Sequence, residues 1–295
     1  MRKLTNKITT KKTTARSAFT LIELLVVISI IAVLMSVIMP AMAKSRQLAK
    51  RAVCTSNIRQ LFLANTGYAN ENNHQYVLAA KDIWGNNLHR WHGTRTSVNK
   101  SFDPAKSPLK NYLGDGEIKR CPEFKKRNYY EQAGQNSSNF EAGCGGYGYN
   151  DEYIGARSDL YGMGNEAATH SARDFEIKNP ASSVMFTDTA FRQQLSGGQD
   201  TFIEYSFAHP PYWTWYLEFA KAGSSSSGIN GRPDPTIHFR HGKFTNVVWA
   251  DGHTSNETME LSAAYVTHAI MTEKETTEMS LGWFGPDNNS LFDLK

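Results

Sequence analysis

The sequence predicts an α+β protein: one long N-terminal helix, membrane-spanning in its first half, packed on a mostly antiparallel β-sheet domain with long loops. Residues 19–43 are apolar, helix-forming residues continue to 70, and short β-branched and aromatic runs among glycines and asparagines fill the rest. We therefore expect a basic leader at 1–18, a transmembrane helix at 19–43, a helical extension at 44–70 and a globular β-rich domain at 71–295.

The charge of the chain is concentrated in its leader. The net charge is +4, and the first eighteen residues contribute six basic side chains and no acid, so the remainder carries −2. A domain this close to neutral has no broad electrostatic reason to bind nucleic acid, and we expect no nucleic-acid partner. A composition of 40% hydrophobic and 20% charged residues excludes disorder across most of the chain.

The run from Phe19 to Ala43 has the length of one bilayer crossing, which needs about 20 apolar residues. Its only charged residue is Glu23, and a carboxylate inside lipid costs about 2.5 kcal/mol or more. Glu23 therefore needs either a partner or a solvated position at the headgroups. The positive leader predicts a cytoplasmic N-terminus and a C-terminal domain in the periplasm or at the cell surface, although Lys44 and Arg46 weaken this charge asymmetry.

The residues around this start carry a resemblance. Ala18-Phe19-Thr20-Leu21-Ile22-Glu23-Leu24-Leu25 resembles the processing site of type IV prepilins and type II secretion pseudopilins. In that family a membrane peptidase cleaves before the Phe and methylates its new amine, and the Glu assists assembly into a helical filament. The resemblance implies a pilin-like fold, a cut between Ala18 and Phe19, and pairing of Glu23 with the Phe19 amine of a neighbouring copy.

The same resemblance implies partners and a location. The partners would be prepilin peptidase and other pilin-like subunits, in a homo- or hetero-filament, and the chain would be a single-pass protein of the inner membrane. A Pro is usual in the family's long helix, and Pro40 fits and should kink it. The family usually has Gly before the cut, so Ala18 predicts slower or incomplete cleavage.

An ordinary signal peptide is the alternative to this interpretation. Ala41-Met42-Ala43 supplies a small-x-small site, and a cut after Ala43 would release the whole domain. However, the apolar run is long for a signal peptide, whose core is ~7–15 residues. The string FTLIE also has no role in this alternative.

Beyond the membrane the helical pattern continues on an amphipathic segment. We expect one helix from about Thr20 to Tyr68, because asparagines crowd after Gly67. The apolar face predicted to pack under the domain consists of Leu48, Ala52, Ile58, Leu61 and Phe62.

The clearest β structure lies near the C-terminus. Two apolar runs flank the turn signal at residues 241–243, which predicts a hairpin. Residues 246–250 are β-branched and aromatic and predict a central strand, which Asp251-Gly252 ends with a turn. Residues 182–188 predict another strand that ends in Asp188.

These residues carry a second resemblance. His241 followed after nine residues by Asp251-Gly252 is similar to the H-x9-DG segment of a large bacterial group of prepilin-processed proteins. That group also has a Cys-Pro, a Tyr-Gly-Tyr-Asn and a strand ending in Asp, in this order. Cys121-Pro122, residues 147–150 and Asp188 match them. This resemblance names a family better than an activity.

Candidate metal ligands lie near the ends of the predicted strands. We expect Asp188, His241, Asp251 and His253 to converge at one end of the sheet, where two His and two Asp suit zinc. Carboxylates with backbone carbonyls would instead suit calcium, which some major pseudopilins bind near the C-terminus. The alternative is local hairpin chemistry, in which Asp251 accepts from turn amides and His241 satisfies a backbone group.

The three cysteines match no zinc spacing. Outside the cytoplasm Cys121 and Cys144 would form a disulfide, and the alternative is three buried thiols with Cys54. A separate aromatic string, residues 212–216, predicts either a flat platform for sugar rings on one strand or tryptophans packed in the core.

Signatures of enzymes are missing from the sequence: it has no G-x-S-x-G, no P-loop and no H-E-x-x-H, so we expect no enzyme. The first functional hypothesis is a pseudopilin-like structural subunit of a type II secretion or pilus-like filament. The alternative is a membrane-tethered or exported binding module for extracellular polysaccharide. A third hypothesis is an exported metal-dependent enzyme.

Overall fold

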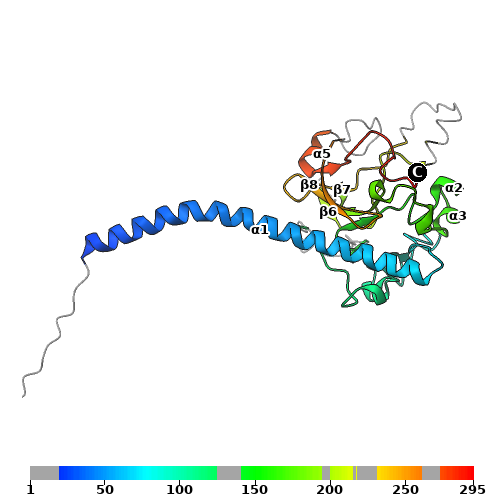
Figure 1. The fold of residues 1–295 in the computed structure, drawn as a ribbon, viewed down its shortest axis with the longest axis horizontal. Coiled ribbons are helices and arrows are strands. Elements are labelled where there is room, and N and C mark those ends of the chain that lie inside the picture. Colours follow the sequence, from blue (N-terminus) through cyan, green and yellow to red (C-terminus); the bar gives the residue numbers. More distant parts are fainter. Residues whose placement is uncertain (1–19, 125–140, 195–199, 215–216, 218–230, 261–272) are drawn as a thin grey trace, which may run out of the picture. The chain divides into compact units, whose positions relative to one another are not determined.

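The computed structural model describes residues 20–124, 141–194, 200–214, 217, 231–260 and 273–295 (Figure 1). The chain divides into two compact units, residues 1–46 and residues 47–295. Each unit is therefore described by itself.

The long helix α1 (Leu21–Glu71) runs without interruption through Pro40. Its end agrees with the prediction, because the chain reverses directly after it. Asn73 and His74 adopt left-handed backbone angles, with φ of 54° and 64°, and the His74 N–H donates to the Ala69 carbonyl at 2.9 Å. This bond satisfies one of the last carbonyls of the helix, as helix C-caps do.

A four-stranded antiparallel sheet forms the centre of the domain. Its order is β3 (Tyr147–Tyr149), β4 (Val184–Asp188), β8 (Phe244–Trp249) and β9 (Thr254–Thr258). β4 is buried along its whole length and β8 from its second residue on. Strands covered on both faces lose the alternation of polar and apolar residues. With α1, this sheet confirms the predicted α+β class and the predicted central strand at 246–250.

Shorter elements surround the sheet. Three two-stranded pairs are β1 (His89–Arg90) with β2 (Gly93–Thr94), β5 (Phe191–Gln194) with β6 (Asp200–Ile203), and β7 (Ile237–His238) with β10 (Leu281–Gly282). The short helices are α2 (Ser158–Tyr161), α3 (Asn165–Ala168) and α5 (Glu273–Met279). Four 3₁₀ turns are η1 (Pro104–Lys106), η2 (Lys110–Tyr112), η3 (Asp174–Glu176) and η4 (Pro180–Ser182).

The domain buries one stripe of the second half of α1. The stripe recurs at helical spacing and consists of Cys54, Asn57, Ile58, Leu61, Ala64, Asn65 and Ala69. Ile58 and Leu61 were predicted. Leu48 and Ala52 are exposed, so their assignment to the buried face was wrong. The buried stripe begins only at Cys54, one to two turns later than predicted.

Two asparagines in this stripe fix the position of the helix against β3. Asn57 Nδ2 donates to the Tyr147 hydroxyl at 3.2 Å, and Asn65 Nδ2 donates to the Tyr149 hydroxyl at 3.1 Å. Asn65 Oδ1 also accepts the Val77 N–H at 3.0 Å. Asn65 is fully buried. Because buried polar groups are costly unless they are paired, a shift of the helix along the sheet would break both bonds to β3 at once.

The predicted hairpin at 241–243 forms only as a turn. Gly242 and Lys243 have φ of 67° and 77°, and the His241 N–H donates to the Phe244 carbonyl at 3.0 Å. The strand before the turn, β7, pairs with β10 instead of β8. β8 already has β4 on one edge and β9 on the other, so it offers no edge to β7.

The turn at Asp251-Gly252 is present as predicted. The Gly252 N–H donates to the Trp249 carbonyl at 2.9 Å, and the Gly252 φ is 87°. A side chain at Gly252 would overlap the ring of Phe62 on α1. Glycine is therefore required here both for the backbone angle and for the close approach of the helix.

We predict that Asn65→Ala destabilises the domain by about 2–3 kcal/mol, because the Tyr149 hydroxyl and the Val77 N–H lose their partner in a buried setting. Asn70→Ala is the matched control, since Asn70 is exposed on the same helix and should change stability by less than about 0.5 kcal/mol. Urea unfolding of the full chain in detergent, followed by tryptophan fluorescence, measures both. Equal effects of the two variants would contradict the role of Asn65.

Candidate functional site

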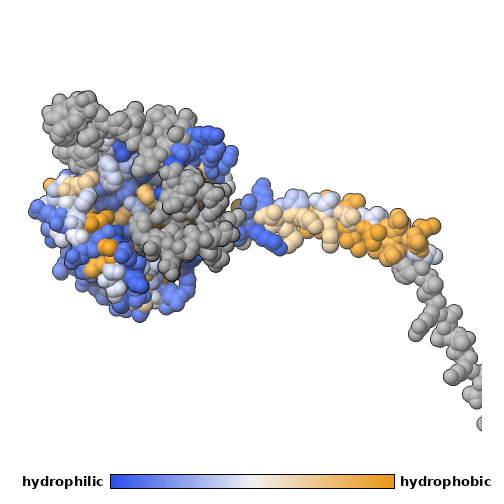
Figure 2. All heavy atoms as spheres, turned by 180° about the vertical axis from the view of Figure 1, so that it is seen from behind, coloured by the Kyte–Doolittle hydropathy of each residue, from blue (hydrophilic) through white to orange (hydrophobic). Residues whose placement is uncertain are grey.

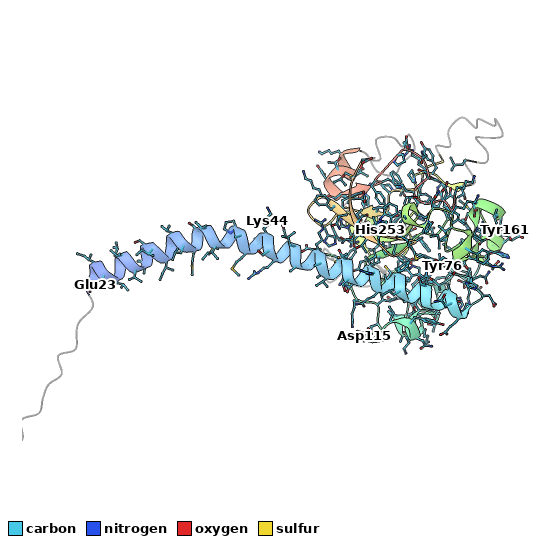
Figure 3. The ribbon with its side chains drawn as sticks, viewed as in Figure 1. Glu23, Lys44, Tyr76, Asp115, Tyr161 and His253 are labelled. Atoms are coloured by element: carbon cyan, nitrogen blue, oxygen red, sulfur yellow. The ribbon has the colours of Figure 1, made fainter. Side chains whose placement is uncertain are left out.

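The first turn of α1 holds Glu23 in a capping box. Glu23 Oε2 accepts from the Thr20 N–H at 2.9 Å and from the Thr20 hydroxyl at 2.8 Å, and the Glu23 N–H donates to Thr20 Oγ1 at 3.2 Å. Figure 3 shows Glu23 at the start of the helix. The T-x-x-E spacing of Thr20 and Glu23 is the sequence signal of this box, and the predictions did not include it. Ala18 and Phe19, the predicted cleavage site, lie outside the described residues.

The helix surface that follows Glu23 is apolar and exposed. Its large hydrophobic side chains from Leu21 to Met42 are exposed by 45% to 79%, and Figure 2 shows them as one hydrophobic stretch. Among the described residues, α1 is the one helix long and apolar enough to cross a membrane. This agrees with the predicted membrane-spanning first half.

A buried ionic centre lies where β4 ends. Asp188 is fully buried, and its Oδ2 accepts from the N–H and the side-chain amide of Asn246, both at 2.8 Å. His241 Nε2 lies 3.3 Å from Oδ2, and Arg240 Nη2 lies 3.6 Å from Oδ1. Burial raises the pKa of Asp188, but the charge of Arg240 and the contact with His241 outweigh it and lower that pKa. Burial lowers the pKa of His241, but Asp188 and Cys121 raise it to about 9.

Two cysteines complete this centre. Cys121 Sγ lies 3.5 Å from His241 Nε2, and Cys54, on α1, brings its sulfur within 4.8 Å of both atoms. Burial opposes ionisation of Cys121, yet its hydrogen bond with Cys54, the Arg240 charge and the His241 contact lower its pKa to about 5. The same hydrogen bond and burial raise the pKa of Cys54. Cys54 and Cys121 were not among the predicted metal ligands, and no spacing in the sequence connects them to Asp188 and His241.

The predicted disulfide between Cys121 and Cys144 is not formed in the structure. All three cysteines are buried free thiols. Cys144 Sγ lies 4.0 Å from Glu204 Oε2, whereas Cys121 Sγ faces His241. The two sulfurs therefore have different surroundings, and the alternative of three buried thiols holds.

The four residues predicted to bind a metal do not all come together. Asp188 and His241 meet, but Asp251 and His253 pair with each other in the β8–β9 turn, with Asp251 Oδ1 2.6 Å from His253 Nδ1. Asp251 Oδ1 also accepts the His253 N–H at 3.0 Å, which is the alternative hairpin chemistry. Asn246, the partner of Asp188, lies three residues before the end of β8, and the extended strand covers ~10 Å over that length before the turn with Asp251 begins.

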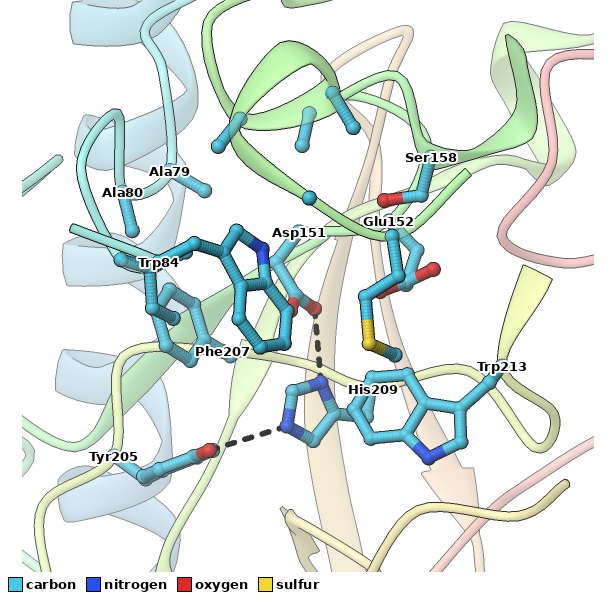
Figure 4. A pocket seen from close by; sticks show the side chains of 16 residues that line it. Ala79, Ala80, Trp84, Asp151, Glu152, Ser158, Tyr205, Phe207, His209 and Trp213 are labelled. Atoms are coloured by element: carbon cyan, nitrogen blue, oxygen red, sulfur yellow. Dashed lines mark hydrogen bonds and ion pairs between the residues drawn. The ribbon is translucent and has the colours of Figure 1, made fainter. Parts of the chain in front are cut away.

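A separate pocket of about 180 Å³ opens among the loops of the domain (Figure 4). Two indoles, Trp84 and Trp213, flank a hydrogen-bonded pair in which His209 Nδ1 lies 3.1 Å from Asp151 Oδ1. Burial lowers the pKa of His209, but the Asp151 carboxylate outweighs it and raises the pKa. Glu152 also lines the pocket, and burial raises its pKa to about 7.

The predicted aromatic strand at 212–216 does not form over its described part. Asn289 occupies both backbone groups of Tyr212: its Oδ1 accepts the Tyr212 N–H at 2.9 Å, and its Nδ2 donates to the Tyr212 carbonyl at 2.7 Å. A strand ladder would need those same two groups. Trp213 lines the pocket and Thr214 is buried, while residues 215–216 lie outside the described residues.

The comparison with family models identifies the N-terminal segment. A model described as the prokaryotic N-terminal methylation motif matches residues 13–39. Searches among curated proteins and among solved structures find no match. The matched segment contains the predicted cleavage site, Glu23 and most of the exposed apolar surface, and the α+β arrangement behind it agrees with a pilin-like fold. Residues 13–39 therefore carry the methylation motif, and this match supports a type IV prepilin-like protein.

Proposed function

We propose that the chain is a non-enzymatic, pseudopilin-like structural subunit. Prepilin peptidase cuts between Ala18 and Phe19, and processed subunits assemble through residues 19–43 into the filament of a type II secretion or pilus-like machine. The observation that carries this proposal is the position of the methylation motif. It lies on a helix whose apolar surface is uncovered among the described residues.

The apolar surface of α1 needs to be covered, first by lipid and then by neighbouring helices. Burying one Leu, Ile or Val side chain stabilises by about 1.5–3 kcal/mol, and α1 exposes many such side chains from Leu21 to Met42. Lipid covers this surface in the inserted subunit. In a filament the same surface packs against the helices of neighbouring copies or of other pilin-like subunits.

Glu23 supplies a specific contact for that packing. The capping box uses Oε2, and an ionised carboxylate accepts about four hydrogen bonds over its two oxygens. Capping its own helix therefore leaves acceptor capacity for an amine from outside. The α-amine of Phe19 on the adjacent subunit neutralises Glu23, which removes the cost of a lone carboxylate among apolar helices.

The proposed location is the cytoplasmic membrane, crossed once. The six basic residues of the leader keep the N-terminus in the cytoplasm, where they are removed with the leader. The domain then lies in the periplasm or at the cell surface.

Glu23→Ala should abolish filament assembly while leaving membrane insertion intact, because breaking a buried ion pair costs about 3–5 kcal/mol. Glu23→Gln is the decisive companion variant. Its amide oxygen can still accept from Thr20 and preserve the capping box, but it carries no charge. Cross-linking between copies in native membranes measures assembly, and alkaline extraction measures insertion. Assembly of Glu23→Gln at the wild-type level would show that Glu23 only caps the helix and would refute the pairing with Phe19.

A second candidate function is a membrane-tethered binding module for extracellular polysaccharide. The pocket between Trp84 and Trp213 favours it, because sugar rings stack on indoles and their hydroxyls donate to carboxylates such as Asp151. Its volume, about 180 Å³, is below the ~300–1,000 Å³ of drug-sized sites and suits one small ring.

On this second hypothesis Trp84→Ala should weaken retention of the detergent-solubilised full chain on insoluble cellulose, chitin or xylan by roughly tenfold, since one stacked aromatic contributes ~1 kcal/mol or more. Phe175→Ala is the matched control, because Phe175 is also an exposed aromatic ring but does not line the pocket. If the wild type is not retained on any of these polymers, or if Trp84→Ala is retained equally, the binding hypothesis is to be abandoned.

A further inference from the structure

The structure places donors of a metal site at the end of β4, in a combination that differs from the one predicted. We propose that Cys54, Cys121, His241 and Asp188 bind one structural zinc ion that ties α1 to the central sheet. This proposal is independent of the proposed function, since a filament subunit and a binding module would both use such a site.

The donor atoms lie at distances that suit a shared zinc ion. One ligand atom each of Cys54, Cys121 and His241 lies within 4.8 Å of the other two. With Zn–S of about 2.3 Å and Zn–N of about 2.0 Å, two tetrahedral ligands lie about 3.5 Å apart for S and N, and about 3.3 Å apart for N and O. The Cys121 Sγ–His241 Nε2 distance in the structure is 3.5 Å, which matches the S–N value. Asp188 lies beside this group of three, with its Oδ2 3.3 Å from His241 Nε2.

One carboxylate oxygen of Asp188 has no hydrogen bond among the described residues. Its Oδ2 accepts two hydrogen bonds from Asn246, whereas its Oδ1 is buried and has no hydrogen-bond donor among the described residues, so Oδ1 is the ligand atom that Asp188 would offer. The nearest cation, Arg240 Nη2, lies 3.6 Å from Oδ1, beyond hydrogen-bonding distance. Buried carboxylate oxygens are normally satisfied, and a cation bound beside Asp188 would satisfy this one.

The charges of the four residues and Arg240 also balance with a divalent ion. Two thiolates and the Asp188 carboxylate carry three negative charges, and Arg240 compensates one of them. A divalent ion with neutral His241 compensates the other two, so the buried site as a whole is neutral. A buried cluster of ionic groups is costly unless its charges are compensated.

The types of ligand atom and their burial indicate which metal the site would bind and that the metal would be structural. Thiolate and imidazole ligands favour zinc and disfavour calcium or magnesium. All four residues are at least nine-tenths buried: Cys54 is 0% exposed, Cys121 1%, Asp188 0% and His241 6%. Four protein ligands without solvent access are typical of a structural site. Because Cys54 lies on α1 and Asp188 on β4, the ion would join the helix to the sheet.

The same geometry disfavours a catalytic cysteine. In a Cys-His-Asp triad the acid and the thiol contact opposite nitrogens of the imidazole. Here both Asp188 and Cys121 face His241 Nε2, while His241 Nδ1 is buried without a partner among the described residues. The arrangement therefore suits ligands that share one ion better than a proton relay.

The test is the metal content of the full chain, purified in detergent without chelators and measured by inductively coupled plasma mass spectrometry. We expect about one zinc per chain, as in a single four-ligand site. Replacement by cobalt should give the intense charge-transfer absorption of thiolate ligands, a readout that needs no variant. Removing zinc with a chelator should lower the melting temperature, and zinc should restore it.

Cys121→Ser and Cys144→Ser form a matched pair, because both thiols are buried but only Cys121 belongs to the site. Cys121→Ser should lower bound zinc by on the order of tenfold or more, and Cys144→Ser should retain it. Three results would overturn the proposal: folded wild-type protein without zinc, a stoichiometric metal other than zinc, or a Cys54–Cys121 disulfide detected by mass spectrometry.

Discussion

The constraint on which the rest of the protein depends is the apolar surface of the first half of α1. Side chains from Leu21 to Met42 are exposed, and the described residues offer nothing that covers them. Such a surface is unfavourable in water and requires lipid or other helices. The methylation motif matches residues 13–39, and the proposed processing at this motif would remove the basic leader and leave the apolar surface in place.

The second half of the same helix meets the opposite requirement, because it must stay fixed within a folded domain. A purely apolar stripe would allow the helix to slide along the sheet, whereas Asn57 and Asn65 pair with two tyrosines of β3 and define one position. Gly252 permits the close approach of Phe62 at another point. The proposed zinc ligand Cys54 lies at the beginning of this stripe, where the domain first covers the helix.

The sequence predicted the elements whose signals are local. The length and pattern of α1, the buried strands β4 and β8 and the turn at Gly252 all follow from neighbouring residues. Contacts between distant segments were not predictable. Cys54, Cys121 and His241 have no recognisable metal spacing, because a helix, a loop and a turn bring them together. One error was avoidable: the strand predicted at 246–250 lies between His241 and Asp251 and so places them at its opposite ends.

The central claim is that the chain is processed as a prepilin and keeps its apolar helix. The most direct test is the N-terminus of the mature protein, isolated from its native membrane and determined by mass spectrometry. A start at Phe19 with a methyl group on its α-amine is the predicted result, and it would leave Leu21–Met42 attached for insertion and assembly. A start at Lys44 would show cleavage by signal peptidase and release of a domain without its membrane helix, which would contradict the account.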